Sequence, residues 1–333
     1  MNMTMNLDEG MEGVGKVSNR KKIYLHIMGG CGNQFFQYAF ARCLQEKIGA
    51  KLVIDYRFVR NAPNLWEGSD NLLKDFNTIE YEYADRRILK DKILSFVVRL
   101  RKFLGYKDFE GRTYRYFLFL ARFLPYIGVY YFDSSYYKFP ITNCKNIVIN
   151  GYFESAKYFS SIDDKIKKEL TPKHKIMECN QDIYERIKET ESVCITIKRQ
   201  DIENPEISDV YKYDMSYFYT GIGYIKSRVE HPVFFIFSDD IEWCKKNVTL
   251  DGEYYFETEG NPIWEKIRLM SSCNHFIIHN STFSWWVQHL STNPDKIVLA
   301  PVKWMQRDDQ PIDIYEDNWL YITPDGKITD HHE

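Results

Sequence analysis

The sequence predicts an α/β protein built from two Rossmann-like domains that face each other across an interdomain cleft. Two observations support this prediction. Residues 22–55 show the order strand, turn, helix, strand, which is the start of a parallel βαβ unit. From residue 193 to residue 299, short apolar strands alternate regularly with helical segments, as in a doubly wound sheet. The 333 residues suffice for two domains of ordinary size, with the boundary near Ser192.

A glycine-rich loop joins the first strand to the first helix. Alternation in residues 23–27 predicts a buried strand, and apolar residues at helical spacing from Phe35 onward predict a helix. Three glycines between them permit positive φ and close backbone approach, and the helix directs its free N–H groups at the loop. We therefore expect Gly32, Asn33 and Gln34 to contact an anionic or hydroxylated ligand. A tight turn before a core helix is the alternative, and Phe35 replaces the third glycine of a dinucleotide-binding fingerprint.

A basic helical insertion is expected at residues 86–122. It holds eleven lysines and arginines against three acids, interleaved with many apolar residues. Basic amphipathic helices can lie on an anionic membrane surface, which here would be the inner face of the cytoplasmic membrane. The alternative is a solvated basic face on helices whose apolar side packs into the domain. We favour the second interpretation, because the domain needs those apolar residues for its core.

The remaining composition indicates a cytoplasmic protein. Residues 1–21 are polar, lack the apolar core of a signal peptide and are expected to be a flexible tail. Residues 323–333 are expected to form a C-terminal tail outside the second domain. No apolar run is long enough to span a bilayer. The formal net charge of −3 gives no support for a nucleic-acid partner. Seven scattered cysteines without a Cys-x-x-Cys pair indicate reduced thiols.

The loop after the strand at residues 193–197 carries the first candidate catalytic residues. Ligands of doubly wound sheets bind at the carboxyl ends of the strands, where this loop lies. Lys198 and Arg199 suit a diphosphate, and Asp201 could hold these cations in position. If the diphosphate is a leaving group, the cations stabilise the charge that grows as the bond breaks. An exposed polar loop is the alternative.

Hydroxyl side chains gather at a second strand end. After the strand at residues 275–278, Ser281, Thr282 and Ser284 stand at the start of a helix, where serine and threonine are favoured caps. Together with free backbone N–H groups they could form a second phosphate-binding cradle. Trp285 and Trp286 follow at helical spacing and are expected in the core.

The sequence predicts no metal site. Asp239 and Asp240 follow the strand at residues 233–237, but they lack Asp-x-Asp spacing and open a helix, where acids are stabilised in any case. The eight histidines form no ligand pair at metal-binding spacing. Asp239 remains a candidate ligand contact because it lies at the carboxyl end of a predicted strand.

Four motifs in order resemble the bacterial α-1,2-fucosyltransferases of glycosyltransferase family 11. They lie at residues 29–42, 151–159, 235–244 and 275–286. The resemblance spans about residues 22–305. It implies a GT-B fold with a first, acceptor-side domain over residues 22–191 and a nucleotide-sugar domain over 192–322. It further implies a GDP-fucose donor, inversion at the anomeric carbon and no metal or other cofactor. Asn33 and the loop of Ser281, Thr282 and Phe283 would touch the donor.

Four positions depart from the pattern of that family, and one of them is Val287, which stands in place of a small residue after the tryptophan pair. Thr196 stands in place of a histidine, and Lys198 in place of an arginine expected at the β-phosphate. Lysine keeps the charge but lacks the planar fork of arginine. Lys266 occupies a position where an acid commonly accepts hydrogen bonds from guanine, and lysine has no acceptor. Two alternatives therefore stay open: a transferase that uses a different nucleotide sugar, and a non-catalytic binding protein of a polysaccharide assembly complex.

The expected reaction is transfer of fucose from GDP-fucose to a galactoside-type glycan acceptor in the synthesis of a surface polysaccharide or O-antigen. Lys198 and Arg199 would assist the departing diphosphate during direct displacement. A base must take the proton of the acceptor hydroxyl. Its candidates on the same loop are Glu203, Glu206 and Asp209.

Overall fold

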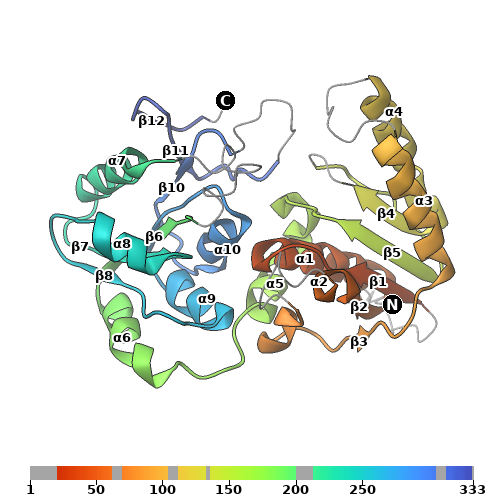
Figure 1. The fold of residues 1–333 in the computed structure, drawn as a ribbon, viewed down its shortest axis with the longest axis horizontal. Helices are drawn as coiled ribbons and strands as arrows, with labels where there is room; N and C mark the ends of the chain where they lie inside the picture. The colour runs from red at the N-terminus through yellow and green to blue at the C-terminus, as the bar shows by residue number, and fades with distance from the viewer. Residues whose placement is uncertain are drawn as a thin grey trace, which may run out of the picture.

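The computed structural model describes residues 21–61, 70–103, 112–132, 136–199, 213–304 and 313–331 (Figure 1). In this part of the chain there are two sheets, one in each half. The first has the strand order β3-β2-β1-β5-β4 and is parallel throughout. The second has the order β12-β11-β10-β9-β6-β7-β8, and only the β11–β12 pair is antiparallel. The prediction of two Rossmann-like α/β domains is thus confirmed.

Three helices pack on the first sheet: α1, α3 and α4. α1 contacts β1 and β2, whereas α3 and α4 contact β4, and α3 also contacts β5. Alternate residues of β1 are buried, as the sequence pattern predicts. The bounds of these elements are β1 (Lys22–His26), α1 (Cys31–Ile48), β2 (Lys51–Asp55), α2 (Arg57–Arg60), β3 (Glu82–Tyr83), α3 (Leu89–Phe103), α4 (Arg112–Ala121), β4 (Val129–Phe132) and β5 (Asn146–Gly151).

The second sheet is covered on both faces. One face packs against α7 and α8, and the other joins a larger core that also contains the first domain. Two helices, α5 (Asp163–Glu169) and α6 (Gln181–Glu189), lie between the sheets in the chain. The second half comprises β6 (Glu191–Ile197), α7 (Met215–Lys226), β7 (Pro232–Ser238), α8 (Ile241–Asn247), β8 (Tyr254–Phe256), α9 (Ile263–Ser271), β9 (His275–Ile277), α10 (Thr282–Leu290), β10 (Val298–Pro301), β11 (Leu320–Ile322) and β12 (Ile328–Thr329).

Two boundary predictions are wrong. α1 begins at Cys31 rather than near Phe35, because Gly30 adopts an extended N-cap conformation and the following residues are already helical. The C-terminal tail predicted for residues 323–333 contains β12, which pairs with β11. Neither β11 nor β12 was predicted, because β12 has only two residues and β11 is defined by its pairing with β10.

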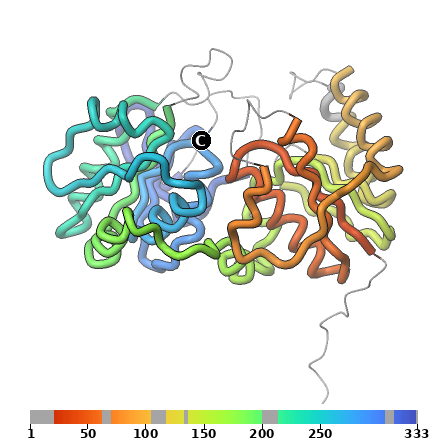
Figure 2. The backbone as a smooth tube through the Cα atoms, turned by 60° about the horizontal axis from the view of Figure 1, so that its bottom comes forward, coloured from red at the N-terminus to blue at the C-terminus, as the bar shows by residue number. Residues whose placement is uncertain are grey.

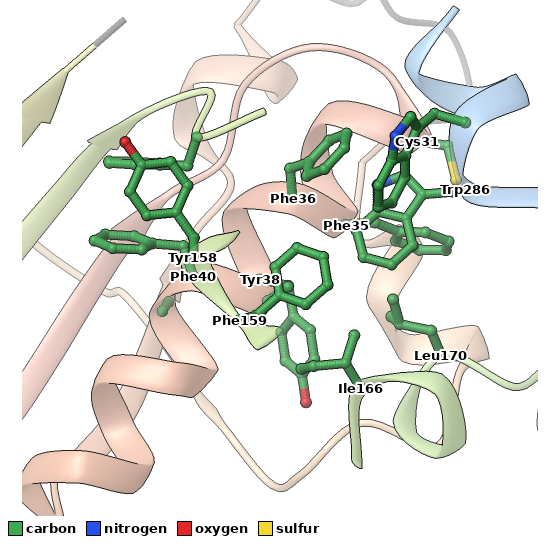
Figure 3. Packing of buried hydrophobic residues seen from close by; sticks show 14 of the residues in the cluster. Cys31, Phe35, Phe36, Tyr38, Phe40, Tyr158, Phe159, Ile166, Leu170 and Trp286 are labelled. Carbon is green, nitrogen blue, oxygen red and sulfur yellow. The ribbon is translucent and has the colours of Figure 1, made fainter. Parts of the chain in front are cut away.

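Packing of α1 against α10 joins the two domains. Phe36 lies 4.6 Å from Trp285 and 5.0 Å from Trp286 between ring centroids, and Phe35 lies 5.6 Å from Trp286 (Figure 3). All four side chains are fully buried, so the prediction that both tryptophans belong to the core is confirmed. Figure 2 shows the red α1 meeting the blue second domain at the centre of the molecule. The domains are therefore held together by a continuous core.

A buried histidine adds an ionic contact at this joint. His289 of α10 donates from Nε2 to Asp163 Oδ1 over 2.7 Å and from Nδ1 to Glu316 Oε1 over 3.0 Å. Burial disfavours the charged ring, but the two carboxylates outweigh it and raise the pKa of His289. Burial likewise opposes ionisation of Asp163, yet hydrogen bonds from His289 and Lys167 lower its pKa to about 2. Both shifts favour the ion pair in the folded protein.

Replacing His289 by glutamine should therefore destabilise the protein in a pH-dependent way. The contribution of His289 is complete below the ordinary histidine pKa of 6.5 and is lost as the pH rises through the raised value. That of Asp163 is complete above the ordinary 3.8 and is lost as the pH falls towards 2. We expect the difference in melting temperature between wild type and His289→Gln to be largest between these two ordinary values and to shrink at alkaline pH.

The matched control is His174→Gln, because His174 is an exposed residue paired with Asp75. Its melting temperature should follow that of the wild type at every pH. A His289→Gln difference that does not change between pH 6 and pH 9 would contradict the role given to the charged ring.

Candidate functional site

The N-termini of α1 and α10 meet face to face. A Cβ atom added at Gly32 would lie 2.3 Å from the Thr282 carbonyl carbon and 2.4 Å from the Phe283 nitrogen, so only glycine fits there. Thr282 Oγ1 donates to Asn33 Oδ1 over 2.8 Å. The structure thus brings together the predicted residues Gly32, Asn33 and Thr282 from opposite ends of the chain.

The predicted contact residues of these two helices differ in accessibility. Gln34 is fully buried and donates to the carbonyl oxygen of Gly29 over 3.1 Å, so it holds the turn before α1. Ser284 is also buried. Four residues remain partly accessible at the junction: Asn33, Ser281, Thr282 and Phe283. Ser281 caps α10, because its side chain accepts a hydrogen bond from the Phe283 nitrogen. One predicted hydroxyl therefore serves as a helix cap, as expected from its position.

Asp239 organises the cationic loop at the end of β6. Its Oδ1 accepts from the backbone nitrogen of Arg199 over 2.6 Å, and its Oδ2 lies 3.7 Å from Lys198 Nζ. The Arg199 guanidinium stacks over the Trp243 ring at 3.9 Å. Because β6 and β7 are adjacent parallel strands, their carboxyl ends present Lys198, Arg199 and Asp239 together. The predicted residues Asp201 and Glu206 lie outside the described residues.

A cavity of about 170 Å³ adjoins this loop at the carboxyl ends of β7 and β8. Asp239 lines it and also contacts Lys198 and Arg199, so the cavity lies beside the cationic loop. Asp240 on its wall caps α8 by accepting from the Trp243 nitrogen over 3.0 Å. The full lining consists of Ser238, Asp239, Asp240, Ile241, Glu242, Glu257, Thr258, Glu259, Gly260 and Lys266.

A buried ion pair forms the inner wall of this cavity. Glu257 Oε1 accepts from the Ser238 nitrogen over 2.8 Å and from Lys266 Nζ over 3.0 Å. Glu257 is only 2% exposed, and its Oε2 accepts no hydrogen bond of normal length within the described part of the chain. Desolvation raises the pKa of Glu257, although Lys266 opposes the shift. Lys266 has no acceptor atom of its own, but it is thus paired with Glu257, whose carboxylate supplies acceptors.

Glu154 is a further candidate that the sequence interpretation missed. It follows β5 at the domain joint, where Ser155 Oγ donates to Asp313 Oδ2 over 2.9 Å and Lys157 Nζ lies 2.8 Å from Asp313 Oδ1. The preceding Phe153 has a φ of 54°, an unusual conformation for a non-glycine residue. Desolvation raises the pKa of Glu154 to about 7. The sequence did hold one indication of this role, because Glu154 lies within the motif at residues 151–159.

No group of three or more His, Cys, Asp or Glu side chains in the described residues is placed to hold a metal ion. None of the helices described has both the length and the apolar character needed to cross a bilayer.

Two facing α/β domains with a polar site at strand ends and helix N-termini define a GT-B-like glycosyltransferase. The solved fucosyltransferase NodZ from Bradyrhizobium has a similar fold: the TM-score is 0.52 at 12% identity, over 94% of this chain and 98% of that one. A NodZ structure co-crystallised with GDP gives a TM-score of 0.50 at 11% identity, again over 94% and 98% of the chains.

The chain belongs to glycosyl transferase family 11, whose model matches residues 22–323. It is 30% identical over 315 residues to an O-antigen biosynthesis glycosyltransferase of Escherichia coli, covering 90% of this chain and 100% of the relative. It is 26% identical over 308 residues to an α-1,2-colitosyltransferase of Escherichia coli, covering 90% and 98%. A 90-residue segment is 33% identical to human galactoside α-(1,2)-fucosyltransferase 1, covering 26% and 24%.

The close approach at Gly32 predicts an unequal effect of two neighbouring substitutions. Gly32→Ala forces a methyl group into the α10 backbone, and overpacking of this kind costs about 1–3 kcal/mol. Gly30→Ala is the matched control, because Gly30 has a φ of −75° and no atom within 4 Å of an added Cβ. Urea unfolding should show a loss of less than about 1 kcal/mol for the control. Equal losses would mean that the α1–α10 approach is not as close as described.

Proposed function

We propose that this chain transfers fucose, or a similar deoxy sugar such as colitose, from a GDP-linked donor to a galactoside-type acceptor with inversion. The product would belong to a surface polysaccharide such as O-antigen, made at the cytoplasmic side of the membrane. Membership of glycosyl transferase family 11 supports the transfer reaction. The names of the relatives support both the sugar and the pathway. The structural observation that carries the proposal is the buried Glu257 carboxylate beside the cationic loop.

Glu257 suits the base of a guanine nucleotide. Guanine presents N–H donors on one edge, and a carboxylate offers acceptors only. Glu257 Oε1 is already bonded to Ser238 and Lys266. Its Oε2 is buried next to Asn261, and the base is proposed to reach this oxygen by displacing the Asn261 side chain. Lys266 stands where the family commonly has an acid. Glu257, nine residues earlier in the chain, is proposed to take the role of that acid. This arrangement supports GDP over the alternative of a different nucleotide.

The diphosphate is proposed to lie between the end of β6 and the N-terminus of α10. Lys198 and Arg199 would face it from one side, and the backbone N–H groups and hydroxyls of Ser281 and Thr282 from the other. In the reaction the acceptor oxygen bonds to the anomeric carbon while the bond to the diphosphate oxygen breaks. The departing diphosphate takes up the negative charge, and one well-placed donor there is worth roughly 3–4 kcal/mol. Asp201 is proposed to hold the two cations in position.

The proposed candidates for the base that removes the acceptor proton lie on two segments of the chain. Glu203, Glu206 and Asp209 follow β6, outside the described residues. Glu154 lies on the first domain, where the acceptor is expected, and its pKa of about 7 suits a group that accepts a proton near neutral pH. A titration experiment separates the two.

Nucleotide binding is predicted to depend on Glu257. The unaltered protein should bind GDP at least about tenfold more tightly than UDP, CDP or ADP in calorimetric titrations. Glu257→Gln should weaken GDP binding by about 10- to 100-fold, because a hydrogen bond to a charged acceptor is lost. Glu253→Gln is the control. Glu253 lies on the same domain as Glu257, but it is exposed and pairs with Arg186. A preference for UDP or CDP would support the alternative donor, and no binding of any nucleotide would support the non-catalytic alternative.

Glu154→Gln is predicted to remove the alkaline activation of the enzyme. In the unaltered chain, the rate of transfer from GDP-fucose to a galactoside should rise with pH around 7, because Glu154 must be deprotonated to act as a base. The variant should lose about 100-fold in kcat and show no rise at that pH. Glu185→Gln on α6 is an exposed control that should retain the profile. If Glu206→Gln removes the rise and Glu154→Gln retains it, the base is Glu206.

A further inference from the structure

The solvent-facing side of α3 alternates apolar and basic residues. Positions 89, 92, 96, 99 and 103 recur every three or four residues and therefore form one stripe along the helix. They are occupied in order by Leu, Lys, Phe, Arg and Phe. All five residues are exposed, and Leu89, Phe96 and Phe103 reach 74%, 66% and 87%.

The opposite side of α3 already supplies the contacts that hold the helix. Leu94 and Val97 are buried in the shared core, and Arg101 lies 5.8 Å from the Phe117 ring of α4. The exposed phenylalanines are therefore not needed to anchor α3. The interpretation of this segment as a helix packed by its apolar side is correct for the inner face, but it does not explain the outer one.

The neighbouring elements carry further exposed apolar residues. α4 and α3 lie side by side at one edge of the molecule, on the side of the first domain away from the second (Figures 1 and 2). Lys90 Nζ donates to the Ile127 carbonyl oxygen over 2.6 Å, which ties the start of α3 to the turn after α4. Eight of the fifteen strongly exposed large hydrophobic residues in the described part of the chain lie here. They define the α3–α4 patch: Leu89, Phe96, Phe103, Phe119, Leu120, Phe123, Tyr126 and Ile127.

The charge around this patch is the reverse of the charge of the whole protein. Residues 86–103 hold seven basic residues and one acid, a net +6 in a chain whose total is −3, so the remainder carries −9. The single acid, Asp91, is buried and lies 3.1 Å from His26. It therefore does not offset the positive surface.

We propose that the α3–α4 patch docks the protein on a lipid bilayer rich in anionic headgroups. Phenylalanine and leucine would enter the headgroup–acyl boundary, while Lys92 and Arg99 extend between them to the phosphates. A protein partner fits less well, because the charged residues alternate with the apolar ones along the stripe, whereas protein interfaces place charge at a rim around an apolar centre. Docking is independent of the sugar transfer, since no residue of the patch belongs to the proposed site.

Co-sedimentation of the full chain with vesicles tests the proposal. The protein should bind vesicles of phosphatidylcholine with about one third phosphatidylglycerol at least about tenfold better than phosphatidylcholine alone, and less at high salt. Phe96→Ser with Phe103→Ser, and separately Lys92→Glu with Arg99→Glu, should each reduce binding at least about tenfold. Lys175→Glu with Lys188→Glu makes the same charge change on exposed residues elsewhere and should bind as the wild type does.

Each variant is checked for an unchanged GDP-induced melting shift, so that loss of folding is not mistaken for loss of docking. If GDP does not bind, an unchanged urea unfolding curve serves the same purpose, and the docking result stands apart from the proposed donor. Equal binding to both vesicle types, or variants that bind anionic vesicles like the wild type, would overturn the proposal. So would a concentration-dependent dimer that both double variants abolish, without any vesicle binding by the wild type.

Discussion

The packing of α1 on α10 is the constraint on which the rest of this structure depends. Two aromatic residues from each helix are fully buried against one another, so the domains share a core instead of meeting at a polar surface. This contact brings two helix N-termini together, and their free N–H groups and dipoles favour an anion at that point. The same residues that join the domains therefore form the junction at which the diphosphate is proposed to lie.

The site around this joint combines residues held in fixed positions with acids whose charge depends on pH. Gly32, Asn33 and Thr282 are held by close backbone approach and a direct hydrogen bond, and His289 adds a charged contact on the same helix. Glu257 and Glu154, in contrast, are acids whose burial raises their pKa values. Carboxyl groups with raised pKa values are frequent at functional sites, because binding and proton transfer need groups whose charge is easily changed.

The sequence predicted most of the fold because the strands of a doubly wound sheet are buried runs with strong patterns. The strands from β6 to β10 lie within two residues of the predicted positions. The start of α1 was misplaced, because a glycine loop and a helix beginning with glycines look alike in sequence. β11 and β12 were missed, because β11 is defined by its pairing with β10 and the two residues of β12 are too few to show a pattern.

By itself, the sequence determined the α/β class, the two domains and the residue types at the strand ends, because periodicity and turn chemistry are local. Only the tertiary structure decided which of these residues act on one another. Lys266 lacks an acceptor when considered alone, but it is bonded to Glu257, and Asp239 holds the loop of Arg199 forty residues away. The pKa of Glu154 likewise follows from the atoms packed around it. Such contacts join residues that are distant in the sequence and become neighbours only in the folded chain, which no local pattern specifies.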